Sequence, residues 1–142
     1  MLLLGAALEQ RDMSKIKLAS KTQIYLDTKS LLDLILDVTP EYPRMYRYSV
    51  GCKMHDILIT LLGEISAAYI NNDKALRLKY LIDFQANFET LKTLVRLSIE
   101  RRWIRTRGRQ ANIILLMENI GKQSTAWKKT LSSANGGNNS EN

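Results

Sequence analysis

Apolar side chains recur at intervals of three and four residues along most of this 142-residue sequence, and no segment alternates apolar with polar residues over the length of a strand. Intervals of three and four place side chains on one face of an α-helix, whereas strict alternation indicates a half-buried β-strand. The four segments with this spacing are 22–39, 47–71, 74–105 and 109–131. The sequence therefore predicts an all-α protein in which each helix buries one face.

Helix-breaking residues separate the four segments. Pro40 and Pro43 end the first helix, because proline has no backbone N–H with which to continue it. Asp73 is a good N-cap for the third helix, and Gly108, the sole helix breaker before the fourth, is predicted to close the last corner. Short connections join neighbouring helices in opposite directions, so we predict an antiparallel up-down four-helix bundle over residues 22–131.

The two ends of the sequence differ in composition from this central region. Residues 1–21 are expected to form a flexible N-terminal extension, and the Gly/Asn-rich residues 132–142 a disordered tail. The apolar stretch 1–8 is shorter than the roughly 20 residues of a membrane span, and no basic stretch precedes it as in a signal peptide. The single cysteine, Cys52, allows no intramolecular disulfide. We therefore expect a cytoplasmic protein without a membrane partner.

Positive charge is concentrated in one half of the chain. The formal net charge is +7, yet residues 74–131 carry 13 Lys/Arg against 4 Asp/Glu, while the remainder carries 8 against 10. A basic half joined to a near-neutral half produces a directed electrostatic surface, which indicates an anionic partner. Solubility alone is the alternative explanation.

The densest basic stretch is residues 96–110, which contain six arginines and one acid, Glu100. Guanidinium groups suit phosphate recognition, because they offer forked donors and stay charged. No helix-turn-helix, zinc-finger, RNP or KH signature accompanies them, so nucleic-acid binding would use phosphates, depend on salt and show weak sequence specificity. The residues predicted to contact a partner or nucleic acid are Lys92, Arg96, Arg101, Arg102, Arg105, Arg107, Arg109, Lys122, Lys128 and Lys129.

Not all of these residues carry equal weight. Lys92 and Arg96 share a helix face with Glu89 and Glu100, so they form either intrahelical ion pairs or a cationic contact point, and both interpretations stay open. The arginines beyond them lie where the third helix ends, and the helix dipole explains one or two of them. Trp103 within this stretch could stack on an unpaired base, but a role in the core is favoured.

Candidates for catalysis are few. His55 is the only histidine, and it lies near Cys52 and Asp56. Zinc normally requires three or four ligands, and no second His/Cys pair is present. No Gly-rich phosphate loop is present either. The sequence therefore predicts no catalytic residue, no metal and no cofactor, and a small enzyme using Cys52, His55 and Asp56 is an alternative hypothesis.

Three short motifs point to a known family. They are "YPRMYRYSVGCKM" (42–54), "LKTLVRLS" (91–98) and "MENIGKQSTAWKKTL" (117–131), in that order. Over residues 24–131 the chain resembles the accessory variability determinant (Avd) proteins of diversity-generating retroelements. The ribosomal-RNA intervening-sequence proteins are a related bundle family, and they provide the alternative of an RNA-associated or structural protein without a polymerase partner.

The resemblance implies several properties. Avd-like proteins are non-catalytic and form a homopentamer with a basic surface. They associate with the reverse transcriptase and its template RNA, and the complex makes mutagenised cDNA that replaces sequence in a variable target gene, a process called mutagenic retrohoming. The pair Lys92 and Arg96 matches the family pattern and becomes the first candidate for the partner-contacting surface. Residues 124–126, where the family often has further glycine before Trp127, are Ser, Thr and Ala in this chain.

The remaining matches to the family motifs have other implied roles. The positions Pro43, Arg44, Arg47 and Gly51 match the loop and the start of the second helix, and their roles are expected to be mainly structural. The fourth-helix pattern is matched by Glu118, Gly121, Lys122 and Trp127.

Overall fold

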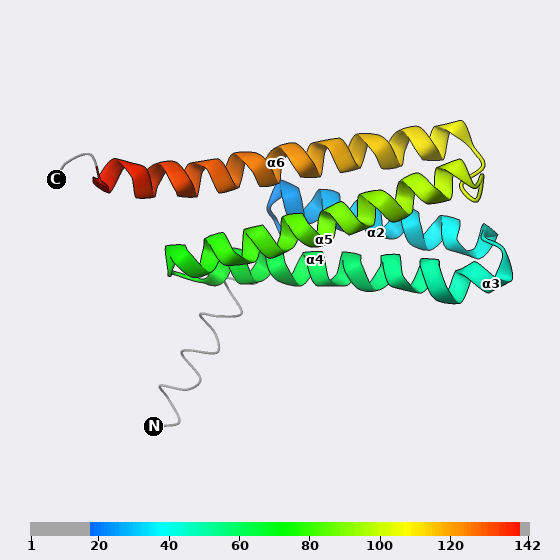
Figure 1. The fold of residues 1–142 in the computed structure, drawn as a ribbon, viewed down its shortest axis with the longest axis horizontal. Helices are drawn as coiled ribbons and strands as arrows, with labels where there is room; N and C mark the ends of the chain where they lie inside the picture. Colours follow the sequence, from blue (N-terminus) through cyan, green and yellow to red (C-terminus); the bar gives the residue numbers. More distant parts are fainter. Residues whose placement is uncertain (1–17, 140–142) are drawn as a thin grey trace, which may run out of the picture.

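Four long helices make up most of the computed structural model, which describes residues 18–139 and the side chains of residues 18–133 (Figure 1). The elements are α2 (Gln23–Val38), the 3-10 helix η1 (Thr39–Glu41), α3 (Arg44–Tyr46), the π-helix η2 (Arg47–Gly51), α4 (Cys52–Ile70), α5 (Lys74–Glu100) and α6 (Arg107–Asn139). No strand occurs between residues 18 and 139, so the predicted all-α class is confirmed.

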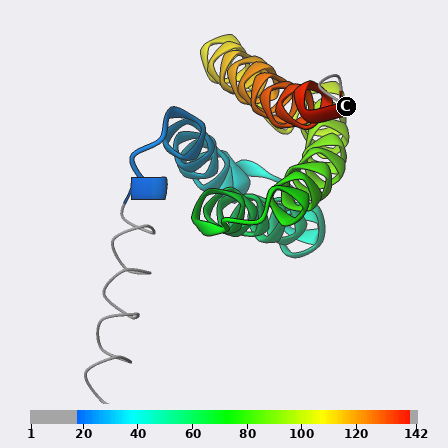
Figure 2. The same ribbon diagram turned by 90° about the vertical axis from the view of Figure 1, so that its left-hand side faces the viewer.

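The long helices form a closed four-helix bundle. Successive helices run in opposite directions along the long axis of the molecule (Figure 1). Seen from one end, they surround the core in the order α2, α4, α5, α6, so that each helix packs on two neighbours (Figure 2). The contact between α4 and α5 is the most extensive, and that between α5 and α6 is the least extensive of the four. The predicted four-helix bundle is therefore confirmed, with its most open seam between α5 and α6.

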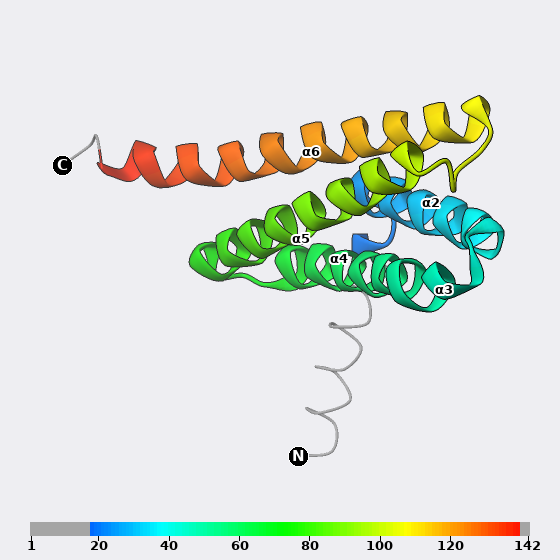
Figure 3. The same ribbon diagram turned by 45° about the vertical axis from the view of Figure 1, so that its right-hand side comes forward.

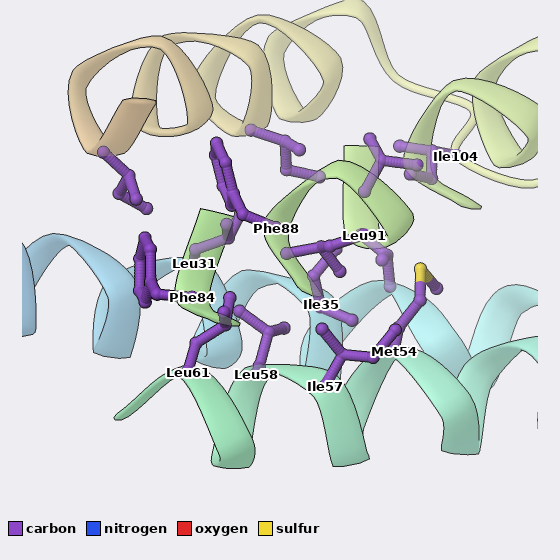
Figure 4. Close-up of a cluster of buried hydrophobic side chains, with 14 of the residues drawn as sticks. Leu31, Ile35, Met54, Ile57, Leu58, Leu61, Phe84, Phe88, Leu91 and Ile104 are labelled. Atoms are coloured by element: carbon purple, nitrogen blue, oxygen red, sulfur yellow. The ribbon is translucent and has the colours of Figure 1, made fainter. Parts of the chain in front are cut away.

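The core is formed by the apolar faces that the spacing predicts (Figure 4). Its fully buried side chains include Leu31, Ile35, Met54, Leu58, Leu61, Phe84, Leu91, Ile104 and Ile113. Full burial of one such side chain stabilises a fold by roughly 1.5–3 kcal/mol. These contacts link all four long helices, so the core is the main source of stability.

The corner between α2 and α4 is held by contacts of Thr39 in addition to the two prolines. Thr39 Oγ1 donates a hydrogen bond to Ile35 O (2.6 Å) and lies 3.0 Å from His55 Nε2. Because the hydroxyl proton is used on Ile35, His55 must donate to Thr39, which places its proton on Nε2. Gly51 lies directly against the Thr39 side chain. Helical structure resumes at Arg44, three residues before the predicted start at 47.

The corner between α5 and α6 differs from the prediction. Helix α5 ends at Glu100 rather than near 105, because Trp103 N donates to Ser98 O (2.9 Å) and Arg102 N donates to Ile99 O (3.0 Å). These two bonds form a Schellman motif, in which the residue after the C-cap adopts the left-handed conformation. Arg102 is that residue, with φ of 60°. The prediction that Gly108 closes the corner is wrong, since Gly108 lies in the first turn of α6.

The boundaries of the bundle also extend beyond the predicted ones. Residues 18–21 belong to the predicted extension, yet Ala19 is fully buried and its carbonyl accepts a hydrogen bond from Thr22 Oγ1 (2.7 Å). Residues 132–139 continue α6, where a disordered tail was predicted. No proline interrupts this stretch, and each glycine costs a helix only about 1 kcal/mol. Residues 1–17 and 140–142, the rest of the two predicted terminal segments, lie outside the described residues.

Replacing Gly51 by alanine is expected to lower the free energy of unfolding by about 1–3 kcal/mol. A Cβ at this position would lie 2.5 Å from Thr39 Cγ2, and Thr39 is held by two hydrogen bonds. Gly63→Ala is the matched control, because no atom lies within 4 Å of its added Cβ, and we expect it to raise stability by roughly 0.5–1 kcal/mol. Thermal melts followed by circular dichroism measure both, and equal effects would contradict a tight corner.

Candidate functional site

Lys92, the first predicted contact residue, lies half-buried on the third long helix, α5. Its ammonium group pairs with Glu89 Oε1 at 2.5 Å and lies 5.3 Å from the centroid of the Phe88 ring. An exposed i,i+3 pair contributes little stability, about 0.2–1 kcal/mol, and the ring adds a cation–π attraction of similar size. The ion-pair interpretation thus holds for Lys92, and the two contacts fix the position of its charge.

Arg96, one helical turn further along α5, is exposed. No carboxylate among the described side chains lies within ion-pair distance of its guanidinium group. Arg96 and Lys92 line one wall of a groove of about 880 Å³ between α5 and α6, and Lys122 lines the opposite wall. The groove brings together three of the predicted residues from two helices.

The groove has an apolar lining and charged groups at its edge. Helix α5 contributes Phe88, Val95 and Ile99 to the apolar lining. Helix α6 contributes Ile114, Met117, Ala126 and the Thr125 side chain. Glu100 and Glu118 line it together with the three basic residues. Carboxylates repel phosphate groups, whereas apolar centres with mixed charge at the rim are typical of protein interfaces. The groove therefore suits a protein segment with an apolar face better than a nucleic-acid backbone.

A second basic region lies on the turn between α5 and α6. Arg101, Arg102, Arg105 and Arg107 are all exposed there. A hollow of about 510 Å³ on this turn is lined by Arg102, Ile104, Arg105, Arg107 and Gln110. Three of the arginines therefore share the hollow, and no carboxylate lines it. This arrangement is suited to phosphate groups.

Three predicted residues lie apart from these two regions. Arg109 Nη1 pairs with Glu41 Oε1 at 2.7 Å, so its charge links η1 to the start of α6. Lys128 and Lys129 lie further along α6, and neither lines the groove or the hollow. The predicted set is therefore divided by the structure into a groove, a turn and separate surface positions.

The indole of Trp103 is buried, with 9% of its surface exposed. Its ring centroid lies 5.2 Å from that of Tyr42 and 4.6 Å from that of Tyr46, with the Tyr46 ring stacked on it. Such aromatic pairs contribute roughly 0.5–1.5 kcal/mol beyond the burial of their area. The core role favoured for Trp103 is confirmed.

Sequence reasoning missed the apolar part of the groove. A signal was present in the run Ile113–Met117 of α6, where five consecutive apolar residues give the helix more apolar surface than one packed face requires. Ile113 is buried in the core, whereas Ile114, which lines the groove, is 45% exposed. Leu115 is 56% exposed on the side of α6 that faces α2. The excess apolar surface is available to a partner.

The three residues of the alternative enzyme hypothesis lie at the start of α4. His55 bonds to Thr39, while Cys52 and Asp56 are exposed. Within residues 18–139, no group of three or more His, Cys, Asp or Glu is placed to hold a metal ion. In the same part of the chain, no helix is both long and apolar enough to cross a membrane.

Among the residues that the structure describes, two groups have a clearly shifted pKa, and both shifts arise from packing. Burial raises the pKa of Glu64, against the opposing effect of a hydrogen bond from Asn87 Nδ2 (2.8 Å), and the Asp83 charge adds to the increase. Burial also raises the pKa of Tyr42, and the Ser98 hydroxyl partly opposes that shift. Neither residue lines the groove or the hollow on the turn. These shifts therefore do not mark an acid–base site at either basic region.

These features define a small helical-bundle protein whose distinctive chemistry lies on its surface. Residues 18–131 match the bAvd-like protein family, and the chain belongs to that family. The predicted resemblance to Avd proteins, the accessory proteins of diversity-generating retroelements, is thereby confirmed. A comparison with curated proteins finds no significant match.

Replacing Arg102 by glycine is expected to raise the free energy of unfolding by about 1 kcal/mol, because a side chain at φ of 60° strains the backbone. Arg102→Ala is the matched control, since it removes the charge and keeps the strain, and we expect no gain from it. Thermal and denaturant melts measure both changes. A gain of the same size in both variants would show that charge repulsion, rather than backbone strain, limits stability at this turn.

Proposed function

We propose that this protein is the non-catalytic accessory protein of a diversity-generating retroelement, and that it binds the reverse transcriptase and the template RNA to support mutagenic cDNA synthesis. The observation that carries this proposal is the α5–α6 groove, because Lys92 and Arg96 of the family motif lie at its edge. Membership of the bAvd-like family over residues 18–131 supports the same assignment. With these partners, we propose that the protein acts in the cytoplasm and without a membrane partner.

The two basic regions suit the two partners differently. The groove has apolar lining and both signs of charge, which favours a segment of the polymerase. The turn that carries Arg101, Arg102, Arg105 and Arg107 favours template RNA, and the cDNA made from it, because phosphates interact well with exposed guanidinium groups. This division assigns a separate surface to each partner.

The alternative, an intervening-sequence-type bundle protein without a polymerase partner, shares the fold and the basic character. Genome neighbourhood distinguishes the two, because a retroelement accessory protein should be encoded beside a reverse transcriptase and a template repeat. The bAvd-like match favours the retroelement assignment.

Removing both charges at the groove, in Lys92→Ala/Arg96→Ala, is expected to reduce co-purification of the adjacent-gene reverse transcriptase at least about tenfold, since truncated hot-spot residues cost about 2 kcal/mol or more. The melting temperature should change little, because the variant loses one exposed ion pair and one cation–π contact. Lys29→Ala/Lys79→Ala is the matched control: it removes two exposed lysines from α2 and α5 and should keep the polymerase.

The co-purification is performed with and without RNase. Loss of polymerase in both conditions for the groove variant alone supports a direct protein contact. Retention of polymerase by the groove variant would show that the contact surface lies elsewhere, and loss in wild type after RNase would show that RNA bridges the two proteins.

We further propose that the protein assembles as a homopentamer, as in other Avd-like proteins. Multi-angle light scattering should then give a mass of about 82 kDa, five times the 16.3 kDa of one chain. A mass of one chain at working concentration would contradict the homopentamer and leave the polymerase proposal to be tested on the monomer.

A further inference from the structure

The two corners of the chain meet at the same end of the bundle. In two views, η1, α3 and η2 lie at the end where α5 turns into α6 (Figures 1 and 3). The Tyr46 ring stacks on Trp103 with centroids 4.6 Å apart, and the Arg109–Glu41 ion pair joins η1 to α6. One surface is thus formed by residues that are far apart in the sequence.

Aromatic rings extend from the core to this surface. Tyr42 is fully buried, Trp103 is 9% exposed and packs against it, and Tyr46 stacks on Trp103 with 37% of its own surface exposed. On the same short helical segment, Tyr48 and Met45 are 75% and 76% exposed. A rigidly backed aromatic ring with an open side loses little entropy when another flat ring stacks on it.

The two segments at this end of the bundle are rich in arginine. Residues 39–51 and 101–109 together carry seven arginines and one carboxylate, that of Glu41. Glu41 is already paired with Arg109, and Arg47 Nε donates to Tyr42 O (2.7 Å). The other five arginines are exposed and make no ion pair with any described side chain. Five arginines at this end of the bundle are therefore free of ion pairs with the described side chains, although the exposed carboxylate of Glu100 directly precedes Arg101.

Arg102 adds to this pattern. It stands at the position of the Schellman motif that glycine usually fills, with φ of 60°. An arginine there costs backbone strain that glycine would not, and it adds a cation to the hollow that Arg105 and Arg107 also line. The sequence thus has a charged side chain at a position where the backbone geometry favours glycine.

We propose that this end of the bundle binds single-stranded RNA, with unpaired bases stacking on Tyr46 and Tyr48 and phosphates contacting Arg101, Arg102 and Arg105. The proposal rests on the RNA binding proposed above and names the form of RNA and two contact residues, Tyr46 and Tyr48, that the basic residues alone do not indicate. Duplex RNA hides the faces of its bases in the stack, whereas a single strand can offer both faces and phosphates. The hollow on the turn has no carboxylate in its lining, whereas Glu100 and Glu118 line the α5–α6 groove.

Binding is measured by fluorescence anisotropy of the full chain with three probes. They are an oligouridylate of about 12 nucleotides, an abasic strand with the same phosphate backbone, and an RNA duplex of the same length. The abasic strand retains the phosphates and lacks the bases, so it separates stacking from charge. The wild-type protein should bind oligouridylate more tightly than the abasic strand.

Tyr46→Leu and Tyr48→Leu should each weaken oligouridylate binding by about fivefold to 100-fold and leave abasic-strand binding unchanged. Tyr25→Leu is the control, because Tyr25 is a half-buried tyrosine near the start of α2, and it should change neither. Tyr46 supports Trp103, so circular dichroism confirms folding of that variant. Tyr48 is 75% exposed, so its replacement tests stacking without affecting the fold.

Arg101→Gln/Arg105→Gln should weaken binding of all three probes. It should also reduce the salt dependence of single-strand binding by about 0.7 in log–log slope for each phosphate that the protein no longer neutralises. Lys29→Gln/Lys79→Gln, the control with the same change in net charge, should have a smaller and uniform effect.

The outcomes separate this proposal from the proposed function. RNA binding that needs the arginines and tolerates both tyrosine changes would overturn stacking and leave the accessory function intact. RNA binding that tolerates all these changes would place the RNA site elsewhere on the protein. Loss of polymerase association, with RNA binding kept, in the tyrosine variants would make this end a protein interface. Absence of RNA binding by wild type would remove the RNA part of both proposals.

Discussion

The packing of Trp103 against Tyr42 and Tyr46 connects the two corners of the bundle and determines how α6 lies on the other helices. Trp103 reaches these rings because α5 ends at Glu100 and the backbone reverses at Arg102. If α5 continued to residue 105, Trp103 would be displaced around and along the helix from this pocket. The place where α5 ends therefore controls where α6 begins and where both basic regions form.

The two basic regions adjoin each other along the chain, at the end of α5 and on the turn after it, but differ in chemistry. Lys92 and Arg96 lie on regular helix, where the neighbouring turns supply Phe88 and Glu100 and the facing helix supplies further apolar side chains. The arginines beyond Glu100 lie on the turn between α5 and α6, and no carboxylate lines the hollow there. Mixed charge over an apolar surface favours protein, and uniform charge beside aromatic rings favours nucleic acid.

Much of the fold could be predicted from residue spacing, and the errors have physical causes. The buried stripes were correct because burial on a helix follows a period of 3.6 residues, as in Leu81, Phe84, Phe88 and Leu91 of α5. The end of α5 was predicted too late, because an arginine in the left-handed conformation has no local sequence signal. The groove was missed because it depends on the distance between two helices, and spacing within one helix contains no such information.

The sequence by itself determined the class of fold, the family and the presence of a strongly basic half, since periodicity, motifs and net charge are properties of the chain alone. Only the tertiary structure decided which basic residues act together. Lys122 joins Lys92 and Arg96 because α6 faces α5, Arg109 is taken by Glu41 of η1, and Tyr46 meets Trp103 from a corner 57 positions away in the sequence. Packing sets these distances, and side chains interact according to distance and solvent exposure rather than order along the chain.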